Sequence, residues 1–288
     1  MGEKKEPCSF DDEAALVKAF GLYAVYRSQS GGYRLTKGGV EVGTFAEARI
    51  EEERVLFTLS HGTLLEVSDR GRREILSPSK ATLCGLIASD GGNHSYLYYL
   101  KDKGKYRLSH RTYFCSTDKE LIEAFDRLFL EVYNKGPHHY SNGDGKIRSM
   151  VFDKGVFYDL NDFGVKTGPF RFHVPIEHLD EEGLRAYLRG FFSGDGNISK
   201  SGTTFIIRVY SKHREQLDEL QKAFINAGIR VSELHSRERS ERAGRGKGID
   251  RWFTIYKADH IKFINEIGSL NPNHIEKFEI IKSGAYEV

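Results

Sequence analysis

Residues 188–196 read LRGFFSGDG, and an earlier stretch, residues 83–91, reads LCGLIASDG. Both follow one pattern: Leu, any residue, Gly, two apolar residues, two small residues, Asp and Gly. The acidic positions, Asp90 and Asp195, lie 105 residues apart, about the length of one small structural unit. A matched pair at this separation predicts two related halves that meet at the two copies.

Each copy has the features of the last turns of a helix. The first copy follows Ser77-Pro78, an N-cap residue and a proline at the first helical position, and the second follows three acids at 180–182. The final glycines, Gly91 and Gly196, occupy the position of a left-handed C-cap. Small residues spaced four apart in each copy share one helix face, on which two backbones can approach closely. We therefore expect the two helices to pack together.

The end of a helix is an unfavourable place for an acid, because its carbonyl groups already make it negative. Two carboxylates that converge there repel, and one is driven towards protonation unless a cation intervenes. A hard divalent ion resolves this conflict, since it takes carboxylate, carbonyl and water oxygens. We predict a Mg²⁺ site, which Mn²⁺ could also occupy, at Asp90 and Asp195 with the adjacent Ser89 and Gly194.

The two nonapeptides resemble the signature of the LAGLIDADG homing endonucleases, in the monomeric, two-motif form of archaeal and organellar intron-encoded enzymes. The pattern extends over residues 76–288, and the resemblance implies that Asp90 and Asp195 bind the catalytic metal. At the sixth position, usually acidic in that family, this chain has Ala88 and Ser193. That position is not a metal ligand, so the departure leaves the predicted metal site intact.

Composition narrows the class of protein. The formal net charge of the 288 residues is only +2, so a nucleic-acid partner requires the basic residues to gather on one face. The three cysteines match no zinc spacing, which indicates a reducing compartment. No apolar run could span a bilayer, and the start MGEKKEPCSF lacks the hydrophobic region of a signal peptide. We expect a cytoplasmic protein, or an organellar one, that does not contact membranes.

Hydrophobic periodicity divides the chain into three parts. Residues 1–75 have helical spacing at 11–25 and then short strands, which predicts a small α+β extension. This extension either adds contacts to DNA or only stabilises the rest of the protein. Residues 76–175 and 176–288 each follow one order: motif helix, hairpin, helix, hairpin, helix, with the second hairpin of the first half expected at 146–160. We predict an α+β fold of two pseudo-symmetric αββαββα halves. The resemblance implies that their antiparallel sheets form a saddle for DNA.

The outward positions of these hairpins are rich in basic, tyrosine and serine side chains. A two-stranded ribbon fits the major groove of DNA, where such side chains contact bases and phosphates. The glycine-rich basic loop at 237–248 is suited to phosphates. The residues assigned to double-stranded DNA are Tyr98, Lys105, Arg107, Ser109, Arg111, Arg148, Arg208, Tyr210, Arg237, Arg239, Arg245 and Lys247.

Two carboxylates around a metal predict metal-assisted hydrolysis of phosphodiesters. The duplicated motif supplies one acid for each strand of a duplex. The resemblance adds a basic or polar catalytic residue per half at the end of the second strand, which is Lys212 in the second half and Ser116, or Thr117, in the first. Ser116 is a weak substitute for lysine, so unequal cutting of the two strands is expected. His274 is a further candidate.

We therefore expect a monomeric, site-specific double-strand DNA endonuclease of the intron-homing type, which hydrolyses one phosphodiester per strand of a long asymmetric site. The resemblance implies short 3′ overhangs. The alternatives are an RNA-binding intron maturase and a catalytically inactive DNA-binding regulator on the same fold. Neither alternative needs both acids, so the intact pair favours the endonuclease.

Overall fold

The computed structural model describes residues 14–29, 31–141, 143, 145–165, 172–239 and 248–284. The chain divides into two compact units, Met1–Ile75 and Leu76–Val288. Among the described residues, no helix has the length and apolar character that crossing a bilayer requires.

The first unit consists of two four-stranded sheets, ordered β1-β2-β3-β4 and β5-β6-β7-β8. The strands are β1 (Ala15–Phe20), β2 (Tyr23–Arg27), β3 (Tyr33–Lys37), β4 (Val40–Phe45), β5 (Ala48–Ile50), β6 (Arg54–Thr58), β7 (Thr63–Ser68) and β8 (Gly71–Leu76). Both sheets contribute apolar side chains to one core: Phe20, Val25, Leu35, Val55, Phe57, Leu65 and Val67.

The helix expected at residues 11–25 is wrong over its described part. A hairpin of β1 and β2 occupies this region, with Phe20 opposite Tyr23. Gly21 has a φ of 52°, which permits the two-residue turn that joins the strands. Over its described residues the extension is therefore all-β rather than α+β, while residues 1–13 lie outside the described part. The short strands expected after residue 25 are present, and His61-Gly62 lies in the turn that joins the paired strands β6 and β7.

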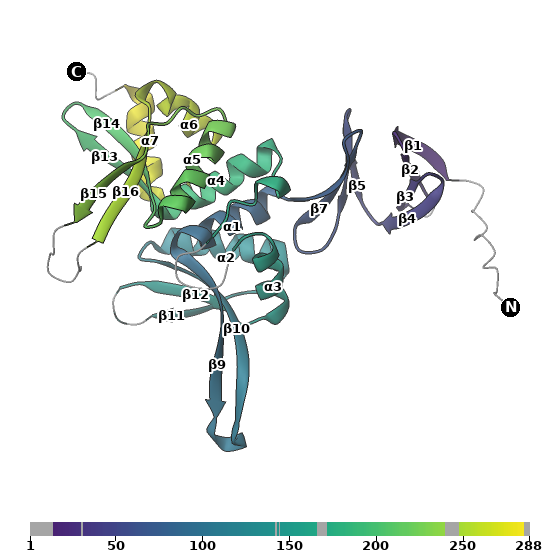
Figure 1. Ribbon diagram of the computed structural model, residues 1–288, viewed down its shortest axis with the longest axis horizontal. Coiled ribbons are helices and arrows are strands. Elements are labelled where there is room, and N and C mark those ends of the chain that lie inside the picture. The colour runs from purple at the N-terminus through teal and green to yellow at the C-terminus, as the bar shows by residue number, and fades with distance from the viewer. Residues whose placement is uncertain are drawn as a thin grey trace. The chain divides into compact units, whose positions relative to one another are not determined.

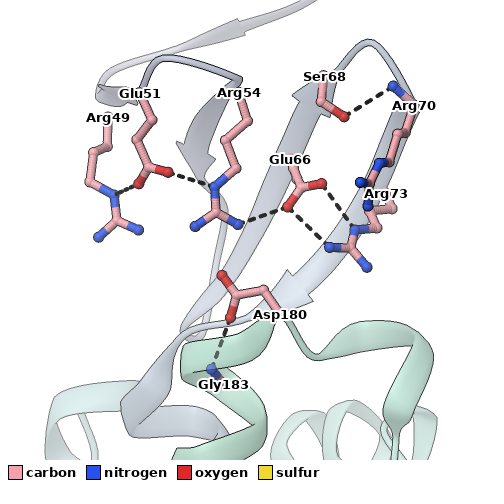
Figure 2. A network of polar contacts seen from close by, with 9 residues as sticks. All are labelled: Arg49, Glu51, Arg54, Glu66, Ser68, Arg70, Arg73, Asp180 and Gly183. Carbon is pink, nitrogen blue, oxygen red and sulfur yellow. Dashed lines mark hydrogen bonds and ion pairs between the residues drawn. The ribbon is translucent and has the colours of Figure 1, made fainter. Parts of the chain in front are cut away.

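Ion pairs link all four strands of the second sheet (Figure 2). Glu66 on β7 is only 5% exposed, and it accepts hydrogen bonds from Arg54 and Arg73 at 3.0 and 3.1 Å. Glu51 pairs with Arg54 at 2.6 Å and with Arg49 at 2.8 Å. A buried carboxylate is costly unless it is paired and hydrogen-bonded. The two arginines therefore make the charge of Glu66 tolerable inside the sheet.

The second unit has the predicted two halves with the same order of elements, except that the second half ends in two helices instead of one (Figure 1). The first half contains α1 (Pro78–Asp90), β9 (Gly91–Leu100), β10 (Lys105–Ser116), α2 (Lys119–Tyr133), β11 (His138–Ser141), β12 (Ile147–Val151) and α3 (Lys154–Asp162). The second half contains α4 (Glu181–Asp195), β13 (Gly196–Ser201), β14 (Thr204–Tyr210), α5 (Arg214–Asn226), β15 (His235–Arg239), β16 (Gly248–Ile255), α6 (His260–Glu266) and α7 (Pro272–Ser283). The sheets are ordered β11-β12-β10-β9 and β13-β14-β16-β15, so equivalent strands have equivalent neighbours.

The second hairpin of the first half differs from the expectation. Residues 156–160, expected as a strand, belong to helix α3, because the side chain of Asp153 accepts a hydrogen bond from the backbone N–H of Val156 and caps that helix. The hairpin partner of β12 is instead β11, which precedes the segment 146–160 where this hairpin was expected. The αββαββα order is retained with a shifted hairpin.

The two motif helices, α1 and α4, pack backbone against backbone. A Cβ on Gly85 would lie 2.1 Å from the carbonyl oxygen of Tyr187, and a Cβ on Gly190 would lie 2.1 Å from that of Thr82. When the two nonapeptides are aligned, Gly85 corresponds to Gly190, and Thr82 and Tyr187 are the residues immediately before each copy. Each half thus gives the other the same contact that it receives, as a twofold interface requires.

The glycines that end the motifs have a different role from the one expected. Gly91 (φ −114°) and Gly196 (φ −75°) are extended rather than left-handed, and each begins a strand at once. Their need for glycine is steric, since a Cβ would lie 2.5 Å from the carbonyl oxygen of Tyr113 at Gly91 and 2.3 Å from that of Phe192 at Gly196. Each motif helix therefore passes directly into the first strand of its sheet.

We predict that Gly190→Ala lowers the free energy of unfolding by about 3 kcal/mol, because the added methyl group must push the two helices apart. Urea-induced unfolding followed by circular dichroism measures this change. Gly136→Ala is the matched control, since a Cβ there meets nothing within 4 Å. A loss at Gly190 no larger than at Gly136 would contradict the proposed packing.

Candidate active site

Asp90 and Asp195 are the last residues of α1 and α4, and the helix contact brings them together. A Cβ on Gly194 would lie 2.2 Å from Oγ of Ser89 and 3.1 Å from Oδ2 of Asp90. Asp195 is half-buried, while Asp90 keeps part of its surface exposed although its carboxyl group faces a cleft. Both line one cleft of about 630 Å³, to which both halves of the second unit contribute. The convergence expected from the repeated motif is therefore present.

The ionised forms of both carboxyl groups are disfavoured in the cleft, so both pKa values are raised. Burial raises the pKa of Asp195 well above the ordinary value of 3.8, and the charge of Asp90 raises it further, while Lys212 opposes the shift. Loss of solvation also raises the pKa of Asp90, against the opposing charges of Lys146 and Lys212. Such a pair favours either protonation or a bound cation.

The donors in the cleft fit a hard divalent ion. Among the described residues, no three or more His, Cys, Asp or Glu side chains gather as a metal cluster. The two carboxylates would therefore need backbone, water or substrate oxygens beside them, which is the ligand set typical of Mg²⁺. The hydroxyl of Ser89 donates to the carbonyl oxygen of Leu86 at 2.8 Å, so this side chain belongs to the hydrogen bonding of the helix. Gly194 provides the close approach described above.

The two residues predicted to assist the carboxylates have different positions. Lys212 lines the cleft just before α5, and its charge acts on both acids. Ser116 accepts a hydrogen bond from the backbone N–H of Asp118 at 3.0 Å and is not among the residues that line the cleft. Lys146 lines the cleft instead, because Ser116 pairs with Ile147 and places the preceding lysine at the end of the strand.

The sequence interpretation did not include Lys146 in the site. The pairing of β12 with β10 would have identified it, but the expected hairpin at 146–160 paired β12 with the wrong segment. Asp250 and Arg251 also line the cleft from β16 and were not predicted. Both follow the glycine-rich loop, whose length hid the register of β15 and β16.

His274, a further candidate, has a structural position. It is 6% exposed, its Nδ1 lies 3.0 Å from Oγ of Ser269, and its ring lies 5.0 Å from that of Phe192. Burial lowers the pKa of this imidazole to about 4, so it is neutral at pH 7. It is not among the residues that line the cleft. The structure thus places His274 in the packing of α7 against α4.

Ser193, at the usually acidic sixth position, links the motif helix to the C-terminal helices. Its hydroxyl donates to the carbonyl oxygen of Arg189 at 2.7 Å and accepts from the backbone N–H of Leu270 at 2.8 Å. Ser193 is completely buried, so an ionised acid there would be unfavourable. The departure from the family pattern is therefore explained by local packing.

The sheet faces turned away from the helices carry most of the residues predicted to contact DNA. Tyr98 is opposite Arg107 across β9 and β10, and alternate residues of a strand share a face. In the second half, the helix-facing side is defined by buried Val209 and Phe253. By strand register, the other faces carry Tyr98, Lys105, Arg107, Ser109, Arg111, Arg148, Arg208, Tyr210 and Arg237.

The structure describes the remaining predicted contacts only in part. Arg239 is the last residue of β15, while Arg245 and Lys247 lie outside the described residues. Arg111 and Arg148 both line the cleft as well as lying on the sheet face. Their guanidinium groups each lie 5.7 Å from the centre of the Tyr113 ring, which holds the two cations beside the same aromatic side chain.

The chain is similar to known proteins in sequence and in fold. Residues 182–268 match the LAGLIDADG-like domain family. The fold is similar to that of mesophilic variants of the homing endonuclease I-DmoI, with a TM-score of 0.50 and 22% identity, over 68% of this chain and 94% of that chain. The I-LtrWI LAGLIDADG homing endonuclease bound to target DNA gives a TM-score of 0.45 and 12% identity, over 71% of this chain and 89% of that chain. The similarity to I-DmoI confirms the predicted fold.

A further similarity covers a shorter stretch. Over 76 residues, the chain is 36% identical to serine-protein kinase RsbW of Bacillus cereus, and the same values hold for that kinase of Bacillus anthracis. The stretch represents 26% of this chain and 47% of the kinase. The chain thus spans about half the length of the curated relatives it matches.

We predict that, without metal, Asp195→Asn raises the free energy of unfolding at neutral pH. The raised pKa means that the folded state holds a proton that the unfolded state releases, so the parent loses stability as the pH rises above the ordinary value of 3.8. Parent and variant should converge below that pH and diverge above it. Urea unfolding in EDTA from about pH 3 to about pH 8 measures this.

The control variant for the pH series is Glu123→Gln on α2, which removes an exposed carboxylate. Added Mg²⁺ should stabilise the parent and leave Asp195→Asn almost unaffected. Parallel curves for parent and Asp195→Asn at every pH would contradict the assignment of a strained carboxyl group.

Proposed function

We propose that this two-motif LAGLIDADG protein is a site-specific double-strand DNA endonuclease. The observation that carries the proposal is the convergence of Asp90 and Asp195 in one cleft, each at the end of its motif helix and each with a raised pKa. Carboxylates forced together in this way form a divalent-cation site. The endonuclease I-DmoI, whose fold this chain shares, makes nucleic acid the first substrate to consider.

The proposed partner is duplex DNA, bound by the two sheet faces that lie away from the helices. These faces combine arginine, lysine and tyrosine side chains, and a two-stranded ribbon fits the major groove. The cleft between the halves adds Arg111, Arg148 and Arg251 beside the acids. One chain supplies both halves, so a monomer suffices for a long site without exact symmetry.

The aspartates and the lysines of the cleft have different roles in the proposed reaction. Asp90 and Asp195 would hold Mg²⁺ or Mn²⁺ with oxygens of the backbone, water and the scissile phosphates. When bound, the metal supplies an activated water and neutralises charge on the phosphate. Lys146 and Lys212 stabilise the negative charge that grows on the phosphate oxygens as water attacks phosphorus and the P–O3′ bond breaks. A 5′-phosphate and a 3′-hydroxyl remain on each strand.

The biological setting is also a proposal. The resemblance to the homing endonucleases implies that the cuts in the two strands leave short 3′ overhangs, and intron homing is the process that such cuts serve. The cytoplasm or an organelle is the expected location. An RNA-binding maturase or an inactive regulator would not require the strained pair of acids, which is why the endonuclease is preferred.

We predict that Asp90→Asn and Asp195→Asn each lower the rate of DNA cleavage by roughly 10³-fold, because each removes a carboxylate of the cation site. Cleaved sequences are first selected from a random duplex library with the parent protein and Mg²⁺. Linearisation of a plasmid that carries the selected site then gives the rates.

The matched control for cleavage is Glu123→Gln, an equal change of charge outside the cleft. Both aspartate variants should still bind the selected site in EDTA, as measured by gel shift. Cleavage at the parent rate by either aspartate variant would contradict the proposed mechanism. Binding of structured RNA without any cleavage of DNA would favour the maturase.

A further inference from the structure

The two halves place different charges at equivalent points around the acids. Ser116 pairs with Ile147 between β10 and β12. At the equivalent position, the backbone N–H of Ser211 donates to the carbonyl oxygen of Arg251 at 3.3 Å, next to the pair of Tyr210 and Trp252. The residue one step before Ile147 is Lys146, and the residue one step before Arg251 is Asp250. A cation in the first half therefore has a carboxylate as its counterpart in the second half.

The lining of the cleft extends this difference. The first half contributes three cationic side chains, Arg111, Lys146 and Arg148. The second half contributes two, Lys212 and Arg251, together with the carboxylate of Asp250. The guanidinium of Arg251 also donates to the backbone carbonyl of Lys212 at 2.6 Å, so part of its hydrogen-bonding capacity is used within the protein. Apart from one motif aspartate in each half, the first half of the cleft is the more positive.

We infer that the cleft cuts the two strands in a fixed order, and that Asp250 makes the phosphate over the second half the slower one. The inference rests on the proposed endonuclease function. Hydrolysis concentrates negative charge on the phosphate oxygens, so a nearby cation accelerates it and a nearby carboxylate slows it. Ser116, a weak substitute for lysine, suggested that the first half would cut more slowly. The inferred order is the opposite, because Lys146 supplies a cation in the first half.

The experiment follows each strand separately on a linear duplex that carries the selected site, with a different fluorophore on each 5′ end. The parent should accumulate a duplex nicked in one strand, with the other strand cut about tenfold more slowly. Lys146→Met should slow the fast strand about 10²-fold, and Lys212→Met should slow the other strand most. Asp250→Asn should accelerate only the slow strand, by about tenfold.

Conservative and control variants separate charge from structure. Asp250→Glu keeps the carboxylate and should cut the slow strand at the parent rate, unlike Asp250→Asn. Glu123→Gln removes a carboxylate outside the cleft and should leave both strand rates within about twofold of the parent. Thermal unfolding of every variant shows whether an altered strand order accompanies a loss of folded protein.

A binding measurement tests the same charges without cleavage. Duplexes with an uncharged methylphosphonate at one of the two scissile positions are titrated in EDTA. In the parent, loss of charge at the fast position should weaken binding about tenfold, while loss at the slow position should change it less than about twofold. In Asp250→Asn, the two substitutions should weaken binding alike.

The outcomes separate this inference from the proposed function. Cleavage with both strands cut at one rate, or with both lysine variants slowing the same strand, would overturn the strand order and leave the endonuclease proposal standing. Equal acceleration of both strands in Asp250→Asn would do the same. No cleavage of any selected duplex by the parent would overturn both.

Discussion

The direct contact between the backbones of α1 and α4 is the constraint on which the second unit depends. At Gly85 and Gly190, even a methyl group would meet the carbonyl oxygen of the opposite helix at 2.1 Å. The contact continues to the helix ends, where Ser89 faces Gly194. The separation of the two acids is thus fixed by main chains rather than by flexible side chains, which favours a preorganised site.

This geometry has an electrostatic cost at the point where it matters for chemistry. Two carboxylates lie at the ends of adjacent helices; loss of solvation raises the pKa of both, and the charge of Asp90 raises that of Asp195 further. Two nearby polar side chains are hydrogen-bonded instead: the hydroxyl of Ser193 donates to Arg189 and accepts from Leu270, and Asp118 caps α2. Carboxyl groups with raised pKa values in a cleft are typical of functional sites.

Sequence patterns predicted the repeated half, the motif helices and the two convergent acids, because each of these depends on local periodicity and on identical spacing in two copies. The errors arose where one side chain or one turn decides the structure. Gly21 makes a hairpin of a stretch with helical spacing, and Asp153 caps a helix in a stretch read as a strand. Lys146 entered the site only through the pairing of β12 with β10, a long-range contact that local periodicity cannot specify.

The two halves also differ in the length of their first hairpins. Strands β9 and β10 have 10 and 12 residues, and the hairpin extends beyond the helices that cover its base (Figure 1). Strands β13 and β14 have only 6 and 7 residues. A strand rises about 3.4 Å per residue, which is also about the spacing of successive base pairs. Along an aligned duplex, the footprint of the first arm would therefore exceed that of the second by about four or five base pairs.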